Sequence, residues 1–122
     1  MKLNHRLKVW LLKYVPDPSM DTCATIAVLV EEDGTGTFAN AQFIKDWDKI
    51  VTLDPMADIE FLEEVKDEVE DAWGSPEERH SLIRILTDSL SNTLQIAESP
   101  VATDDIQIEV DRLVKFNLGQ VA

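Results

Sequence analysis

The chain has 122 residues, of which 44% are hydrophobic, and it carries a formal net charge of −13. This length and apolar content suit a single folded domain over residues 1–122 and exclude a disordered tail. The negative charge excludes direct nucleic-acid binding, because contact with phosphates depends on clustered lysine and arginine. Its lone cysteine, Cys23, excludes an intramolecular disulfide, and no apolar run reaches the roughly 20 residues that span a bilayer. We therefore expect a cytoplasmic protein with no membrane partner.

Three strands are predicted in the first 44 residues. Residues 7–15 carry apolar side chains on both faces, which indicates a central strand that residues 16–19, with two prolines, bring to an end. Thr22–Glu32 is rich in β-branched residues and forms the second strand. Asp33 and the glycine after it are typical of a tight hairpin, from which a third strand returns over Phe38–Ile44.

Two helices are predicted in the middle of the chain. Lys45–Leu53 is left open between a short helix and an irregular turn. Asp54 and Pro55 then match the N-cap and first position of a helix whose apolar residues recur every three or four positions as far as Gly74. Ser75–Glu78 has the spacing of a capping box and begins the next helix.

The C-terminal part adds one strand and one helix. Thr93–Ala97 alternates weakly and predicts a fourth strand, which Pro100 should interrupt. Thr103–Asp105 caps a last helix that ends near Gly119. The order βββ-αα-β-α predicts an α+β fold, an antiparallel sheet of three to four strands covered on one side by about three helices.

Two stretches of the chain resemble a small bacterial family of unknown function. Its members have a strand that ends in Tyr-Val-Pro-Asp, found here at residues 14–17, and a following apolar strand that matches residues 26–30. The family's Glu, Asn and Gly in that second strand are replaced here by Thr22, Thr25 and Ala27. The second stretch holds Leu94-Gln95-Ile96, Pro100, Thr103-Asp104-Asp105 and Val110-Asp111-Arg112-Leu113.

The resemblance implies a complete small domain. Family members are often encoded beside a HipA-like kinase, which implies an accessory role in a bacterial toxin, regulatory or defence system. It implies no reaction, and the replaced polar positions are those at which a family activity would be sought.

Several side chains could carry chemistry, and each has a simpler interpretation. Asp17 with Glu64 and Lys66 matches the residue pattern of a metal-dependent nuclease. That chemistry needs both carboxylates on adjacent strands around one cation, whereas Glu64 is predicted to lie in the middle of a helix. Cys23 and His80 could be nucleophile and base, or a buried apolar cysteine and a surface histidine.

Paired carboxylates in two turns are candidates for a divalent cation. Asp17 with Asp21, and Asp104 with Asp105, could bind a metal, although turn and cap roles explain both pairs. We expect no metal, no cofactor and no catalytic residue, so an enzyme is disfavoured.

Charge is distributed unevenly along the chain. Residues 1–14 are basic, whereas residues 54–73 hold nine acids and only Lys66. Such a helix is a solubilising face, an intramolecular partner for the basic first strand, or a docking face for a basic protein. The predicted partner-binding residues are Glu60, Glu63, Glu64, Asp67, Glu68, Glu70 and Asp71.

Three functional hypotheses follow. The first is an interaction module that binds a basic protein, with Trp47 as the tryptophan expected to be exposed at such an interface. The second, from the same charge, is a nucleic-acid mimic that inhibits a DNA-binding protein or nuclease. The third is a carboxylate-dependent enzyme that uses Asp17 and Asp21.

Overall fold

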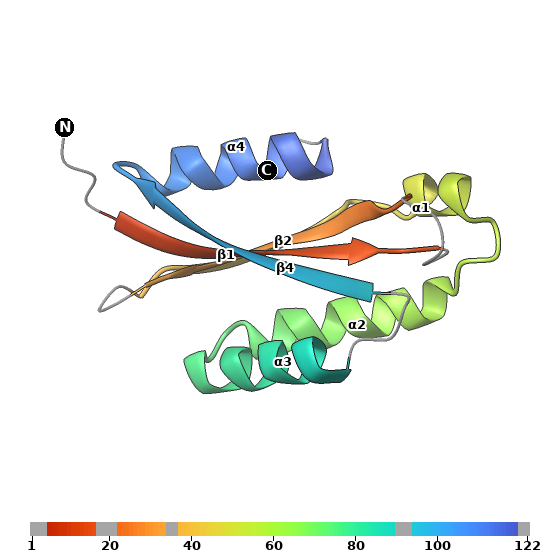
Figure 1. Cartoon of the computed structure of the whole chain (residues 1–122), viewed down its shortest axis with the longest axis horizontal. Coiled ribbons are helices and arrows are strands. Elements are labelled where there is room, and N and C mark those ends of the chain that lie inside the picture. The colour runs from red at the N-terminus through yellow and green to blue at the C-terminus, as the bar shows by residue number, and fades with distance from the viewer. Residues whose placement is uncertain (1–4, 17–21, 34–36, 90–93, 120–122) are drawn as a thin grey trace.

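The computed structural model describes residues 5–16, 22–33, 37–89 and 94–119 (Figure 1). The elements in chain order are β1 (His5–Tyr14), β2 (Ala24–Glu32), β3 (Ala39–Phe43), α1 (Asp48–Leu53), α2 (Ile59–Ala72), α3 (Pro76–Ser89), β4 (Leu94–Thr103) and α4 (Ile106–Leu118). The α+β class and the antiparallel sheet are confirmed. In the described part of the chain, no helix has the length and apolar character needed to cross a membrane.

The four strands form one sheet in the order β3-β2-β1-β4, and each neighbouring pair is antiparallel. β1 is central, as its two apolar faces predicted. Trp10 lies opposite Leu29 of β2 and Glu98 of β4, so these three side chains share one face of the sheet. Leu7, Val9 and Leu11 belong to the other face, because successive strand residues point to opposite sides.

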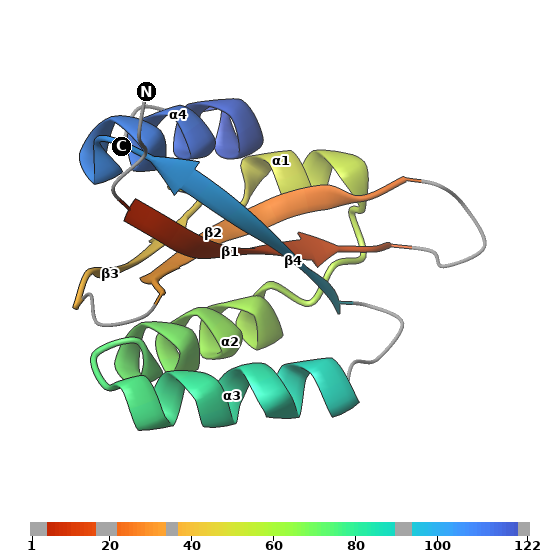
Figure 2. The same cartoon turned by 60° about the vertical axis from the view of Figure 1, so that its left-hand side comes forward.

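Helices cover both faces of the sheet, so the expected one-sided arrangement is wrong. α2 and α3 lie side by side on one face, whereas α4 and α1 lie on the other (Figures 1 and 2). β2 is buried on both sides over residues 26–30 for this reason. A strand covered on both faces has an almost continuous apolar sequence rather than an alternating one.

The start of α2 and the structure of the preceding segment differ from the prediction. Asp54 does not begin the long helix; it terminates α1, and its side chain accepts a hydrogen bond from the backbone N–H of Met56. The N-cap of α2 is Asp58, which accepts from the N–H of Phe61. Asp54 and Asp58 are four residues apart and are both acceptors for backbone N–H groups in this segment. The turn between α1 and α2 uses Asp54, and the start of α2 uses Asp58.

β4 is longer than predicted and runs through Pro100, which lies opposite Lys8 of β1. An edge strand tolerates proline because the missing N–H donor can face solvent. The strand pairs with β1 along its whole length, from Leu94 opposite Tyr14 to Thr103 opposite His5. The predicted hairpin at Asp33 involves residues 34–36, which lie outside the described residues.

The core of the α2–α3 side is built around two tryptophans. Trp10 and Trp73 meet edge to face, with ring centroids 5.7 Å apart and an interplanar angle of 83°. The indole N–H of Trp73 donates to the backbone carbonyl of Val30 at 3.1 Å. Leu62 and Val69 of α2 are fully buried beside them. This packing fixes the position of α2 on the sheet and thereby sets which of its residues face solvent.

Candidate partner-binding surface

The acids of α2 lie on the exterior of the molecule. The helix buries Leu62 and Val69 against the sheet, so its remaining faces turn to solvent. Every acid that the sequence placed there is exposed: Glu60, Glu63, Glu64, Asp67, Glu68, Glu70 and Asp71. Among the described residues, none of these seven forms an ion pair with lysine, arginine or histidine. The basic first strand therefore does not neutralise this face.

The sequence of α2 places like charges next to each other. Four pairs of acids are spaced i,i+4 along the helix, and the last turn contains no basic residue. Like charges at this spacing destabilise a helix, and acids near its C-terminus oppose the helix dipole. Burial of Leu62, Val69 and Trp73 holds α2 in place despite this repulsion. The acidic face is thus maintained at a cost to local stability.

Two hollows with partly apolar linings lie beside these acids, one between α2 and α3 and the other along α2. One hollow of about 440 Å³ has Ala72, Leu82 and Ile85 among its lining residues. A second, of about 350 Å³, lies along α2 and includes Phe61 and Val65. Both hollows share Glu68. We call these two neighbouring hollows together the α2–α3 groove.

The ionisable residues of the α2–α3 groove are all acids. They come from both helices: Glu64, Asp67, Glu68 and Asp71 from α2, and Glu78 from α3. Two large apolar side chains in the groove are open to solvent, with exposed fractions of 38% for Phe61 and 55% for Ile85. The groove therefore combines an apolar floor with a negative rim.

A buried ion cluster fixes α3 to the sheet. The guanidinium Nε of Arg79 donates to Oε2 of Glu31 at 2.8 Å, and its Nη1 donates to the carbonyl of Trp73 at 2.8 Å. The ring nitrogen Nε2 of His80 lies 2.7 Å from the same carboxylate oxygen. Burial by itself raises the pKa of Glu31, but hydrogen bonds from His80 and Arg79 outweigh it and leave that pKa below its usual range.

This cluster was not predicted from the sequence. Glu31 is 7% exposed, and Arg79 is equally buried. The signal in the sequence is a glutamate at an inward position of a strand that is otherwise apolar, since Glu31 shares a face with Leu29. Its partner is 48 residues away in the chain and could be identified only from the fold.

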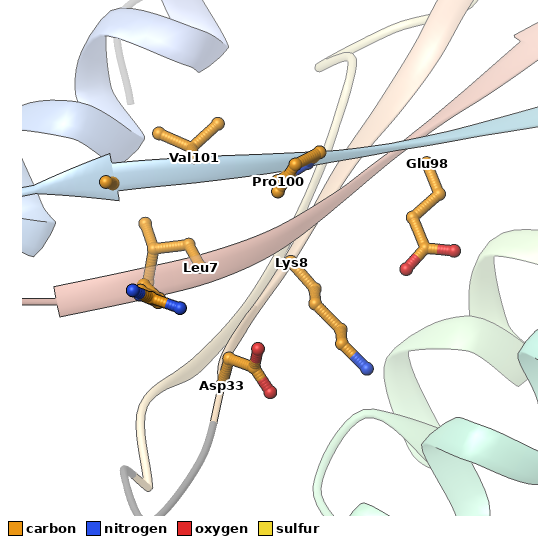
Figure 3. A pocket seen from close by; sticks show the side chains of 8 residues that line it. Leu7, Lys8, Asp33, Glu98, Pro100 and Val101 are labelled. Atoms are coloured by element: carbon orange, nitrogen blue, oxygen red, sulfur yellow. The ribbon is translucent and has the colours of Figure 1, made fainter.

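A separate hollow of about 630 Å³ lies over β1 and β4. Figure 3 shows the side chains of Lys8 and Glu98 pointing from these strands toward the side on which α2 and α3 lie. Arg6 and Asp33 also line it, so the charged groups are of both signs. Such a mixture favours neither an anionic nor a cationic ligand.

Of the two interpretations of Cys23 and His80, the pairing of nucleophile and base is excluded by their positions, whereas His80 is exposed, as the simpler interpretation expected. Cys23 precedes β2 at the Tyr14 end of the strand pair, whereas His80 binds Glu31 near the opposite end of β2. These ends of β2 are seven residues apart, which is about 23 Å at the rise of a strand. Cys23 is exposed, so its interpretation as a buried apolar residue is also wrong.

The candidate metal ligands fall into two groups. Asp17 and Asp21 lie outside the described residues. The nuclease pattern and the candidate cation site in that turn both depend on them and therefore stay predictions. Asp105 caps α4 by accepting a hydrogen bond from the N–H of Ile108 at 3.1 Å. In the described ranges, no three histidine, cysteine or acidic side chains are grouped so that they could hold a metal ion.

Trp47 is the least buried of the three tryptophans, although it is half-buried rather than exposed as expected. Trp10 and Trp73 are buried, whereas Trp47 is half-buried and packs against the edge of the core. Its indole N–H donates to the carboxylate of Glu63, which connects the start of α1 to the acidic helix.

Comparison with known proteins identifies the family of this chain. The family model described as "Protein of unknown function (DUF3037)" matches residues 10–117, which is well over half of the chain. No curated protein and no solved structure matches the chain.

Proposed function

Because this chain belongs to the DUF3037 family, whose description names no activity, we propose a function from its surface. The protein is a non-enzymatic accessory domain that binds a protein partner with a basic surface. The contact is made by α2, through the seven exposed acids described above. It requires no cofactor.

The observation that carries this proposal is that the seven acids of α2 form no ion pair with a basic side chain among the described residues. Three acids elsewhere in the described chain form ion pairs: Glu31 with Arg79 and His80, Glu32 with His5, and Glu109 with Arg112. A solubilising face would be served equally well by charges of both signs, which also stabilise a helix through i,i+4 pairs. A surface with mainly negative charge instead attracts a positively charged partner over long range and increases the rate of association.

The setting of this function follows from the resemblance described for the sequence. We place the protein in the cytosol of a bacterium, in a toxin, regulatory or defence system. A HipA-like kinase encoded beside the gene is the first partner to test, and its basic surfaces are the regions to examine.

A nucleic-acid mimic is the alternative that uses the same charge. The exposed apolar side chains Phe61 and Ile85 argue against it, because they lie among the acids that would stand in for phosphates. A groove that binds phosphates offers polar donors to such groups rather than an apolar surface. The mixed surface fits a protein partner better.

The test is charge reversal on α2. Substituting Glu64, Asp67 and Glu68 by lysine should abolish capture of the partner from the native cell at low salt. A wash at high salt should release the partner from the unchanged protein, because exposed charges are screened. The eluted protein should have a basic surface.

A matched control changes net charge by the same amount elsewhere. Asp48, Asp104 and Asp111 are exposed and lie at α1 and α4, which cover the face of the sheet opposite α2. Their replacement by lysine should leave capture intact. Equal loss in both triple variants would show that overall charge, and not α2, governs binding; unchanged capture by the α2 variant would remove the helix from the proposal.

A further inference from the structure

The α2–α3 groove has the dimensions of a site for a helix. α2 has 14 residues, which corresponds to about 21 Å of helix axis. The two hollows follow α2 from Phe61 to Ala72, so the groove extends along most of that length. Its floor is formed by side chains of two neighbouring helices rather than by a sheet edge, so it offers no backbone groups to an added strand.

We propose that the element of the partner that binds here is a basic amphipathic helix, seated in the α2–α3 groove. This inference rests on the proposed function and specifies the partner's structure. Apolar residues of the incoming helix at i, i+4 and i+7 would contact Phe61 and Ile85, as in other helix-in-groove complexes. Lysines and arginines that flank them would meet the acidic rim.

Charge complementarity selects this occupant over the others. The ionisable lining residues are all acids and come from both α2 and α3. A helix with basic residues on both sides of its apolar stripe can therefore place positive charge against the acids of each helix. The bordering acids also form no ion pair with any described residue, so they are available to a partner.

A second copy of this chain is a poorer match. Its net charge of −13 would be brought against the same charge. The described helix that exposes two large apolar residues is α4, where Ile108 and Phe116 flank Arg112. Arg112 is already paired with Glu109, so Lys115 is the one further basic side chain that α4 would bring to the acidic rim.

The experiment uses the full chain and two synthetic peptides of about 14 residues, the length of α2. Both contain lysine and leucine in the same proportion. In one, leucines recur at i, i+3, i+4 and i+7 and give the helix an apolar face; in the other, the same residues are scrambled so that no such face forms. Affinity is measured by fluorescence anisotropy of the labelled peptide.

The patterned peptide should bind at least about tenfold more tightly than the scrambled one, the ratio that a difference of about 1.4 kcal/mol produces. Substituting Phe61 and Ile85 by serine should remove this preference and leave the weak binding of the scrambled peptide unchanged. Both side chains are partly exposed, so the substitutions spare the core. The matched control substitutes Ile108 and Phe116, on the opposite side of the sheet, and should preserve the preference.

The outcomes separate this inference from the proposed function. The inference that the groove binds an amphipathic helix is overturned if the two peptides bind equally, or if the preference persists after the change at Phe61 and Ile85. Either result leaves electrostatic docking in place. If lysine at Glu64, Asp67 and Glu68 affects neither peptide, the docking function itself fails. A dimer of the chain that the serine substitutions dissociate would assign the groove to a second copy and also overturn the inference.

Discussion

Replacing Arg79 by methionine tests how the buried ion cluster holds α3 on the sheet. In the native protein, this guanidinium donates to Glu31 and to the carbonyl of Trp73, and it lies 5.9 Å from the centroid of the Trp73 ring. Methionine fills a similar volume but offers no donor. Glu31 is then left buried with His80 as its remaining partner.

The magnitude follows from the cost of leaving a buried charge without its partner. Breaking a buried pair by removing one member destabilises a protein by about 3–5 kcal/mol. We expect about 3 kcal/mol for Arg79→Met, because His80 stays within hydrogen-bond distance of Glu31 and its exposed ring gives water access to the carboxylate. Methionine at 79 together with leucine at 31 removes both charges and should cost only about 1 kcal/mol, chiefly from the donor lost at the Trp73 carbonyl.

Urea unfolding followed by tryptophan fluorescence measures both quantities. The free energy of unfolding of the double variant should exceed that of Arg79→Met, so the two substitutions are not additive. Arg112→Met is the control, because Arg112 forms an exposed pair with Glu109 and should change stability little. A small loss for Arg79→Met, or a double variant that loses the sum of the two single effects, would refute the argument from buried charge.

The remaining predictions concern ionisation and capping. Burial, followed by the hydrogen bond to Asp54, raises the pKa of Tyr14, the chain's one tyrosine, to about 12. Its stabilising contribution is therefore present below pH 10 and lost as pH rises toward 12; absorbance titration should show this late ionisation, and Asp54→Asn should bring it earlier. The pKa of Glu31 is lowered below 4.5, so its contribution is present above that pH and lost as pH falls through the folded-state value; Glu31→Gln should remove this part of the acid dependence of unfolding. Asp105→Ala should cost about 1 kcal/mol in thermal unfolding through loss of the α4 cap, whereas Asp104→Ala should not.

Local sequence signals identified elements well where short-range physics decides them. The apolar runs of β1 and β2 predicted two strands, and the periodicity of α2 predicted an acidic exterior that the structure shows as exposed. The cap of α4 was also found, because Asp105 acts on an amide only three residues away. The role of the acids in binding remains a prediction.

Features that depend on distant partners could not be predicted in the same way. β4 passes through Pro100 because it pairs with a strand some 90 residues earlier, and no local pattern records that pairing. The α2–α3 groove requires two helices to lie side by side, so no local pattern could show that Ile85 lines a hollow together with α2. The two apolar faces of β1 did indicate cover on both sides, but segregation of the elements along the chain suggested a single layer of helices.

The position of β1 between β2 and β4 has a consequence for biosynthesis. A chain growing from its N-terminus can pair β1 with β2 early, but the other edge of β1 stays open until residue 103 has emerged. Over that interval an apolar strand presents unpaired backbone groups, a template for association with other chains. A truncated chain that lacks β4 should therefore aggregate. Pairing of β4 with β1 covers this open edge and so protects the newly synthesised domain from association with other chains.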